Sequence, residues 1–239
     1  MAITIKSERE IELMAEAGKI LERVHNELEK ALHPGMSTKD IDTLGEKIIR
    51  SYGCIPSFLN YNGYPASICV SVNQEVVHGI PDKHRIIHEG DIVSLDAGVI
   101  YKGYHSDAAR THAVGEVSEE AKKLIQVTKE CFFEGIKYAK AGNHLFDISG
   151  AIGRYAEERG YGVVRDLCGH GIGTALHEAP EIPNYEVGRK GVKLRPGMTL
   201  AIEPMINIGT YEVDWLDDDW TVVTRDGSLS AHYENTILI

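Results

Sequence analysis

The first fifth of the chain has hydrophobic residues at helical spacing. Ser7 and Glu10 form the pattern of a capping box, in which the two residues satisfy each other's exposed backbone donors. We therefore predict an amphipathic helix over residues 8–31 and a second helix over residues 38–53. The positions that these helices bury are Leu13, Ala17, Ile20, Leu21, Val24 and Leu28 in the first, and Ile41, Leu44, Ile48 and Ile49 in the second.

After the second helix the pattern changes to short strands. Over residues 91–99 apolar side chains alternate with a face that contains Asp96, and a turn at Gly103 leads to a returning strand over 104–114. Asp226-Gly227 is a hairpin turn signal near the end of the chain. The remaining predictions are helices over 118–140 and 145–159, and strands at 67–72, 163–166, 198–207, 220–224 and 229–238.

The order of these elements is two helices then strands, followed again by two helices then strands. No low-complexity segment or linker separates the two sets. The sequence therefore predicts one α+β catalytic domain over residues 1–239, built of two related halves at about 1–115 and 116–239. The two halves suggest an internal duplication, although few residues are identical between them.

Composition and charge narrow the class of protein. The formal net charge of -11 argues against a nucleic-acid interface, because proteins that bind a duplex carry a basic stripe. We interpret a basic run at 189–195 as a solvated turn. Four scattered cysteines fit a reducing compartment, and neither a signal peptide nor an apolar stretch of about 20 residues is present. We expect a cytoplasmic protein that contacts no membrane.

Four carboxylates and one imidazole are candidates for a metal site: Asp96, Asp107, His170, Glu203 and Glu234. Any one of the acids alone would be interpreted as a residue of an edge strand or a solvent-facing surface. Together, in apolar strands, they would be costly to desolvate without cations. Their summed charge of −4 matches two divalent ions, and carboxylates with one histidine favour Mn, Fe(II) or Co. Two such ions can activate water and polarise an amide carbonyl.

Two rival constellations are weaker. The segment Gly169–Gly173 is rich in glycine but lacks the Lys-Ser/Thr pair of a phosphate loop, and it does not match a dinucleotide fingerprint. A Cys168–His170 pair could form a nucleophile and its base, but it would need a supporting acid for which the sequence gives no sign.

Short motifs around these candidate residues recur along nearly the whole chain. In chain order they are Val77-His78-Gly79-Ile80-Pro81, Ser94-Leu95-Asp96-Ala97-Gly98, Gly103-Tyr104-His105-Ser106-Asp107, Cys168-Gly169-His170-Gly171-Ile172-Gly173, Leu176-His177-Glu178-Ala179-Pro180, Ala201-Ile202-Glu203-Pro204 and Tyr233-Glu234-Asn235-Thr236. In these motifs and in their order the sequence resembles type I methionine aminopeptidases. That family has the pseudo-twofold pita-bread fold, a central antiparallel curved sheet covered by helices on its outer face, which agrees with the two halves inferred above.

The resemblance implies removal of the initiator methionine from nascent proteins by water activated between two metal ions (Co, Mn, Fe(II) or Zn). Asp107 and Glu234 are expected to bridge both ions, Asp96 to chelate one, and His170 with Glu203 to hold the other. Glu203 is also expected to act as general base and then general acid. The same resemblance implies nascent N-termini as partners, allows a transient ribosome contact, and suggests a monomer.

The resemblance further implies residues that contact the substrate. His177 is expected to bind the substrate carbonyl or the developing oxyanion, and His78 the scissile amide or the next residue's backbone. Asn73, Glu75 (through its backbone) and Ser230 match a site for one sodium or potassium ion. The expected apolar pocket for methionine, in which positions 58 and 176 differ from other members, consists of Phe58, Tyr61, Tyr64, Cys69, Leu176 and Trp220 together with the two histidines.

Three alternatives remain. Aminopeptidase P and prolidase use the same five ligands, but they carry a large extra N-terminal domain that this chain does not have room for. The type II methionine enzyme has a helical insertion that the interval from His170 to Glu203 cannot hold. A non-catalytic binding module of the same fold would be expected to lack some of the ligands, whereas all five are present.

Overall fold

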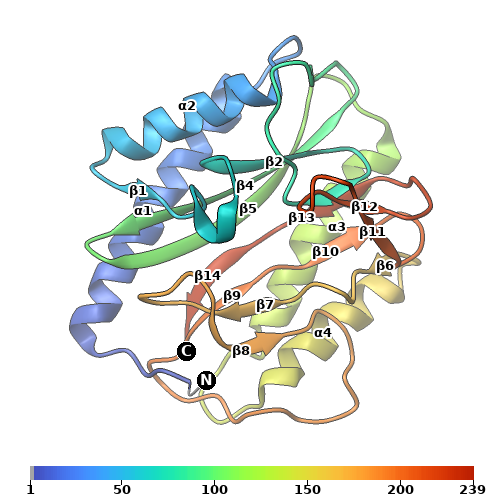
Figure 1. Ribbon diagram of the computed structural model, residues 1–239. Coiled ribbons are helices and arrows are strands. Elements are labelled where there is room, and N and C mark those ends of the chain that lie inside the picture. The colour runs from blue at the N-terminus through green and yellow to red at the C-terminus, as the bar shows by residue number, and fades with distance from the viewer. Residues whose placement is uncertain (1–2) are drawn as a thin grey trace.

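The computed structural model describes residues 3–239, which contain four α-helices, one short 3-10 helix and fourteen strands (Figure 1). The helices are α1 (Glu8–Ala31), α2 (Thr38–Ser51), η1 (Tyr61–Gly63), α3 (Glu119–Ile136) and α4 (Leu145–Glu157). The strands are β1 (Ile55–Pro56), β2 (Ile68–Val72), β3 (Glu75–Val77), β4 (Ile92–Tyr101), β5 (Tyr104–Ala113), β6 (Gly162–Val163), β7 (Gly169–Gly171), β8 (Glu178–Ile182), β9 (Thr199–Ile202), β10 (Met205–Asn207), β11 (Val213–Trp215), β12 (Val222–Thr224), β13 (Ser230–His232) and β14 (Asn235–Leu238). The predicted α+β class is confirmed.

The helices begin where the sequence predicts. Ser7 accepts a hydrogen bond from the Glu10 amide, and the Glu10 carboxylate accepts one from the Ser7 amide, so the capping box of α1 is confirmed. Ser37 and Asp40 make the same reciprocal pair at the start of α2. Helix α3 ends at Ile136, four residues before its predicted end. For the described residues, no helix is long and apolar enough to cross a membrane.

The strands form antiparallel ladders that make up four small sheets. One sheet has the order β1-β4-β2 with β5 paired to β4, a second β14-β9-β7-β8, and the two others β13-β10-β6 and β11-β12-β3. Two backbone hydrogen bonds between Ala109 and Glu234, of 3.0 and 3.3 Å, join β5 to the segment between β13 and β14. The ladders from the two ends of the chain therefore continue across the middle of the molecule (Figure 1).

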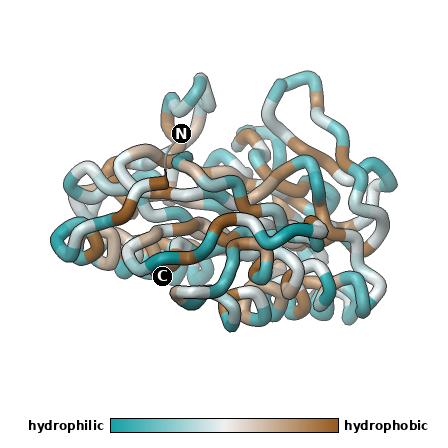
Figure 2. The backbone as a smooth tube through the Cα atoms, turned by 90° about the horizontal axis from the view of Figure 1, so that it is seen from below, coloured by the Kyte–Doolittle hydropathy of each residue, from teal (hydrophilic) through white to brown (hydrophobic). Residues whose placement is uncertain are grey.

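Separate hydrophobic clusters fill the two parts of the molecule. One packs α1 and α2 against β2 and β4, and includes the alternating face Val93, Leu95, Ala97 and Val99. The other packs α3 and α4 against β6, β9, β10 and β13. Figure 2 shows hydrophobic stretches concentrated in the strands and alternating with hydrophilic ones along the helices. The opposite face of β4, which carries Asp96, points toward the space between the two parts.

Three strand predictions need correction. The predicted strand 198–207 is two strands, β9 and β10, separated by Glu203 and Pro204, and proline lacks the N–H that a ladder needs. The predicted strand 229–238 is likewise divided, at Tyr233 and Glu234. The hairpin prediction at 226–227 is wrong, because β12 pairs with β11 and β3 whereas β13 pairs with β10.

Candidate active site

Three carboxylates are brought to one face of the central ladders by strand register. Asp96 on β4 lies opposite Ala109 on β5, and Glu234 exchanges backbone hydrogen bonds with the other side of the same Ala109. Directly opposed residues of antiparallel strands point to the same face, so Asp96 and Glu234 flank the small Ala109 side chain. Asp107, two residues earlier on β5, points to the same face.

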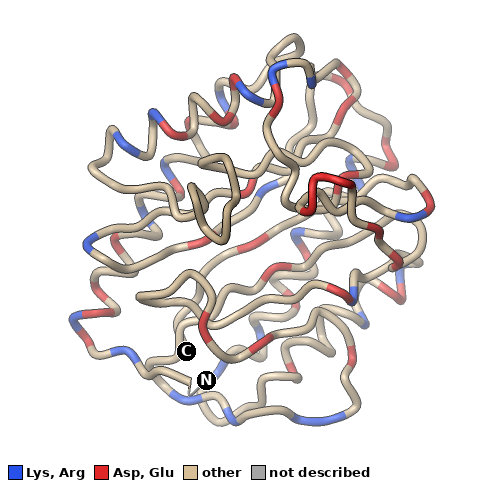
Figure 3. Tube along the Cα trace, viewed as in Figure 1, with Lys and Arg blue, Asp and Glu red and all other residues tan. Residues whose placement is uncertain are grey.

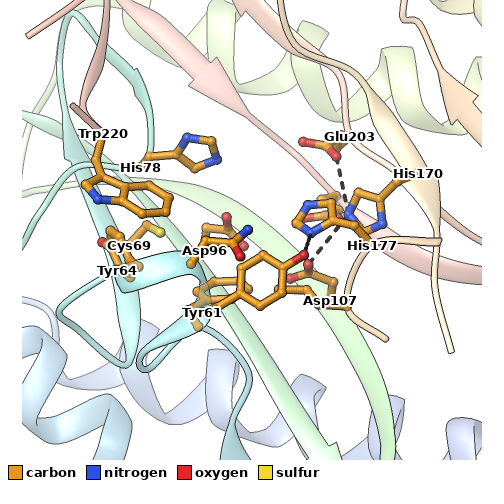
Figure 4. A pocket seen from close by; sticks show the side chains of 14 residues that line it. Tyr61, Tyr64, Cys69, His78, Asp96, Asp107, His170, His177, Glu203 and Trp220 are labelled. Atoms are coloured by element: carbon orange, nitrogen blue, oxygen red, sulfur yellow. Dashed lines mark hydrogen bonds and ion pairs between the residues drawn. The ribbon is translucent and has the colours of Figure 1, made fainter. Parts of the chain in front are cut away.

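The second part of the chain adds an imidazole and a fourth carboxylate. His170 on β7 pairs with Ala201 on β9, and Glu203 follows the end of β9. The Nε2 atom of His170 lies 3.9 Å from Asp107 Oδ2 and 3.7 Å from Glu203 Oε1 (Figure 4). Its Nδ1 donates to the Gly171 carbonyl at 2.8 Å, which leaves the Nε2 lone pair directed at the carboxylates.

Burial and mutual repulsion perturb all five groups. Burial raises the pKa of Asp96 to about 7. Burial, followed by repulsion from neighbouring carboxylates, raises the pKa values of Asp107, Glu203 and Glu234 well above their usual range. Burial lowers the pKa of His170 to about 3, so its imidazole is neutral. Such a cluster favours cations, which would offset the repulsion.

The donor set fits divalent metal ions. Within residues 3–239, Asp96 Oδ1, Asp107 Oδ1 and Glu234 Oε1 are buried without a hydrogen-bond partner. Ligand atoms of Asp107, His170 and Glu234 all lie within 4.8 Å of one another, and Asp96 and Glu203 line the same cavity. Oxygen-rich ligands with one imidazole nitrogen suit Mn, Fe or Co better than soft thiolate-binding metals.

An apolar chamber adjoins this cluster in a cavity of about 440 Å³. Tyr64 meets the Trp220 ring edge-on, with 5.1 Å between the ring centroids, and Cys69 lies directly opposite Asp96 in the β2–β4 ladder (Figure 4). Gly98 allows the close approach of the segment that carries Phe58, because a Cβ there would lie 3.0 Å from the Phe58 ring and 2.7 Å from Ser57 Cβ. All eight residues expected to contact substrate line the cavity: Phe58, Tyr61, Tyr64, Cys69, His78, Leu176, His177 and Trp220.

The two other predicted histidines face this cavity from different loops. His78 follows β3 with a φ of 59°, a conformation that costs energy for a side chain with a Cβ. His177 lies between β7 and β8, where its ring is 4.1 Å from that of His170 between centroids. The Tyr61 ring stacks on His177, and its hydroxyl is hydrogen-bonded to His177 Nδ1 at 2.8 Å. Burial lowers the pKa values of both histidines, that of His78 to about 4.

The residues predicted to bind a monovalent ion lie outside this cavity. The Asn73 carbonyl accepts a hydrogen bond from the Ser230 amide at 2.9 Å, which places these two residues side by side. The Glu75 carboxylate instead accepts from the Val72 amide at 2.7 Å and pairs with Arg85 at 3.4 Å. Only backbone oxygens of Glu75 would therefore be free for an ion.

Sequence reasoning missed two residues. Asn62 lines the cavity with a φ of 49° in the 3-10 turn, and the neighbouring Asn60 and Gly63 also have positive φ. The run Asn-Tyr-Asn-Gly is a turn signal that could have indicated it. His232 lies 3.7 Å from Glu203 through its Nε2 and Oε2 atoms. Its position two residues before Glu234 was the available signal.

Charge around the cavity is uneven. Figure 3 shows several Asp and Glu segments on the central strands, whereas most Lys and Arg segments lie on the surrounding helices and loops. Arg110 is an exception: its guanidinium donates to the Ala109 carbonyl at 2.7 Å, to the Glu234 carbonyl, and to Asn235 Oδ1 at 2.6 Å. Arg110 therefore holds the backbone beside Glu234, and its effect on the pKa of Glu234 is outweighed by burial and by the neighbouring carboxylates.

This combination of fold and acidic site defines a class of metal-dependent hydrolase. Residues 12–239 match metallopeptidase family M24, and the chain belongs to that family. Use of divalent metal by the family agrees with the donor set described above. The fold is the pita-bread fold predicted from the motifs, since it is shared with solved members of the family.

Similarity over the whole chain places it among the methionine aminopeptidases of the family. It is 60% identical to the methionine aminopeptidase of Clostridium acetobutylicum, over 99% of this chain and 95% of the relative. The crystal structure of the Thermotoga maritima methionine aminopeptidase superposes with a TM-score of 0.97 at 47% identity, and the match covers 100% of this chain and 96% of that one. The Xaa-Pro dipeptidase of Bacillus anthracis is less similar, with a TM-score of 0.77 and 28% identity, and this chain spans only 59% of it.

Proposed function

We propose that this protein removes the initiator methionine from nascent polypeptides whose second residue is small. The observation that carries the proposal is the position of five metal-binding side chains at one end of an apolar cavity of about 440 Å³. High identity to methionine aminopeptidases over the full chain supports the same reaction and not cleavage before proline.

Two divalent metal ions would be held by the five clustered side chains. Asp107 and Glu234 would contact both, Asp96 would chelate one, and His170 with Glu203 would hold the other. When bound, the ions activate a water and polarise the scissile carbonyl. Mn, Fe(II), Co and Zn are all compatible with these donors.

The residues of the chain itself orient the peptide and move the proton. Glu203, whose pKa burial raises, takes a proton from the attacking water and delivers it to the leaving amine. His177 has its Nδ1 bound to Tyr61, so its Nε2 is left to donate to the substrate carbonyl. His78 lies across the cavity beside Trp220, where it can contact the scissile amide.

Selection of methionine follows from the shape of the apolar chamber. Hydrophobic burial separates similar side chains by only about 1–3 kcal/mol, so shape must supply the rest of the discrimination. Tyr64 and Trp220 form rigid walls that admit an unbranched thioether, and Phe58 and Leu176 close the chamber further. His78 and His177 then leave room only for a small second residue.

We also propose an oligomeric state, a compartment, a monovalent-ion site and a domain organisation for the enzyme. We infer a monomer in the cytoplasm that meets nascent N-termini during a transient contact with the ribosome; the four cysteines are unpaired, as in a reducing compartment. Asn73, Glu75 and Ser230 would supply backbone and hydroxyl oxygens to one sodium or potassium ion. We also infer a single catalytic domain of two related halves, about 1–115 and 116–239, supported by the repeated order of two helices followed by strands.

A peptide panel tests the proposed reaction. Metal-loaded enzyme is incubated with Met-Ala-Ser, Leu-Ala-Ser, Met-Lys-Ser, acetyl-Met-Ala-Ser and Ala-Pro-Ala, and free amino acid is measured. Rapid release from Met-Ala-Ser alone is expected, because the other peptides lack a fitting first side chain, a small second residue or a free amine. Cleavage of Ala-Pro-Ala with Met-Ala-Ser intact would show that the protein is a proline-specific peptidase instead. No cleavage of any peptide, with metal bound, would indicate a binding module.

A further inference from the structure

A buried histidine outside the proposed ligand set lies directly behind Glu203. His232 ends β13 and is 1% exposed. Its backbone is fixed from the other part of the molecule, since the Thr111 hydroxyl accepts from the His232 amide at 2.8 Å and donates to its carbonyl at 3.0 Å. The imidazole therefore occupies a defined place next to the site.

The imidazole of His232 is polar and unsatisfied. Among the described residues, neither Nδ1 nor Nε2 of His232 has a hydrogen-bond partner. In either protonation state the imidazole ring carries at least one N–H that can donate. A buried donor without an acceptor costs free energy, and a leucine of similar volume would avoid that cost. Packing alone therefore gives no reason for a histidine at this position.

The polar atom that faces His232 is a carboxylate oxygen of Glu203. His232 Nε2 lies 3.7 Å from Glu203 Oε2, while His170 Nε2 lies 3.7 Å from Glu203 Oε1. The carboxylate is thus bracketed by one imidazole at each oxygen. Its backbone carbonyl is also held, by Asn184 Nδ2 at 3.1 Å. A shift of less than 1 Å would bring Nε2–H and Oε2 to ordinary hydrogen-bond distance.

We propose that His232 is a positioning residue, whose Nε2–H holds Oε2 of Glu203 so that Oε1 stays directed at His170 and the reacting groups. This inference rests on the proposed function for the catalytic consequence, in which Glu203 moves the proton. The orientation itself does not depend on the identity of the substrate. Residues that orient ligating carboxylates in this way typically affect metal affinity or activity by about 10–100-fold.

Two substitutions separate positioning from packing. His232→Leu keeps the volume and removes the donor, whereas His232→Gln keeps an N–H donor at similar reach. For His232→Leu we expect a higher Tm in the metal-free protein, a kcat lowered about 10–100-fold with KM changed less than about threefold, and weaker binding of Mn²⁺ in calorimetric titration. For His232→Gln we expect kcat and Mn²⁺ affinity within about fivefold of the wild type.

His112→Leu is the matched control. It also replaces a largely buried histidine whose Nε2 is unpartnered, although its side chain is 13% exposed, and that ring faces Glu29 of α1 at 3.7 Å through Nδ1. Its kcat and Mn²⁺ affinity should stay at the wild-type level. Unchanged kcat and Mn²⁺ affinity in His232→Leu, or a His232→Gln variant no better than His232→Leu, would overturn the proposal. If the wild type cleaves no peptide, the proposed function fails, yet the Tm and Mn²⁺ titrations still decide whether His232 positions Glu203.

Discussion

The two parts of the molecule supply the candidate metal-binding side chains in different ways. Asp96 and Asp107 stand in the middle of two unbroken ten-residue strands, β4 and β5, where register alone sets their direction. Glu203 and Glu234 stand instead at interruptions, between β9 and β10 and between β13 and β14. A regular strand fixes a side chain through its ladder. An interruption frees the backbone to turn the side chain but requires other groups to hold it.

This difference explains where the supporting contacts are found. The Glu203 carbonyl is bound by Asn184, and the Glu234 carbonyl by the Arg110 guanidinium. Asp107 has its backbone amide bound by the Thr236 hydroxyl at 2.9 Å. Glu234 is also held by its two backbone hydrogen bonds with Ala109, so side-chain hydrogen bonds from neighbouring elements add to the ladders at both interruptions and at Asp107.

The largest expected effect is the loss of a proton acceptor at an interruption. Glu203→Gln keeps the shape but removes the base, and we expect kcat to fall by at least about 100-fold, a typical general-base contribution. Steady-state hydrolysis of Met-Ala-Ser measures the change. The control is Glu181→Gln, an exposed carboxylate on β8 opposite His170, which should retain wild-type turnover. A kcat of Glu203→Gln within a few fold of the wild-type kcat would show that Glu203 is not the general base.

Metal removal should make stability depend strongly on pH. The pKa of Asp96 is raised to about 7 in the folded protein, above its ordinary value of 3.8, so this group contributes stability at low pH that is lost as pH rises through about 7. The other three carboxylates shift in the same direction. The buried histidines His78, His170 and His232 have lowered pKa values and act in the opposite direction, so the contribution of Asp96 is isolated by comparing chelated wild type with chelated Asp96→Asn. Between pH 4 and 8 the wild type should lose of order a few kcal/mol more stability than the variant. Urea unfolding across this pH range measures the difference, and parallel profiles of the two chelated proteins would contradict the repulsion.

Close packing of the regular hairpin predicts a smaller effect. Gly98→Ala would place a Cβ 2.7 Å from Ser57 Cβ, and overpacking of this kind costs about 1–3 kcal/mol. We expect lower stability and a raised KM, because the shifted segment carries Phe58. Gly18→Ala in α1 is the control: its Cβ would meet Ser106 Oγ at an ordinary 3.7 Å, and alanine favours the helix. Equal stability changes in the two variants would show that the hairpin tolerates the extra atom.

The smallest expected effect is at the contact between the two parts. Tyr61→Phe removes the hydroxyl bound to His177 and keeps the stacked ring. The loss of one hydrogen bond, about 0.5–1.5 kcal/mol, should lower kcat about 2–10-fold if it orients His177. Tyr52→Phe, which loses a bond to Glu27 far from the cavity, should leave kcat unchanged. A change in KM alone for Tyr61→Phe would assign Tyr61 to substrate binding only.

The sequence predicts the regular elements better than the interrupted ones. The Ser7–Glu10 capping box and helical spacing locate α1 closely, helical spacing alone locates α2, and alternation locates β4 and β5. The interruption at Glu203 was missed because apolar residues continue on both sides, although Pro204 marks it. Strands β7 (Gly-His-Gly) and β8 (Glu-Ala-Pro-Glu-Ile) were missed because neither has an alternating apolar pattern, and their pairing comes from long-range contacts.

The site residues likewise divide into those that the sequence predicts and those that only the folded chain defines. The five candidate ligands are visible as carboxylates and a histidine in apolar or glycine-rich segments, and the structure brings them to one cavity. His232 is not visible in this way, because its sequence signal is limited to its position two residues before Glu234. Its meaning depends on a 3.7 Å approach to Glu203 across two strands, which only the folded chain defines.

We propose that side chains from regular and from interrupted strands converge on the same metal ions. In the experiment that tests this convergence, metal-stripped protein is titrated with Mn²⁺ while bound metal and hydrolysis of Met-Ala-Ser are followed together, for the wild type and for Asp96→Asn. In the wild type we expect two ions per chain and activity that follows their binding, and in Asp96→Asn we expect one weakened site and lost turnover. Full activity of the stripped protein with metal loss verified, or Mn²⁺ binding unchanged by Asp96→Asn, would contradict shared metal binding.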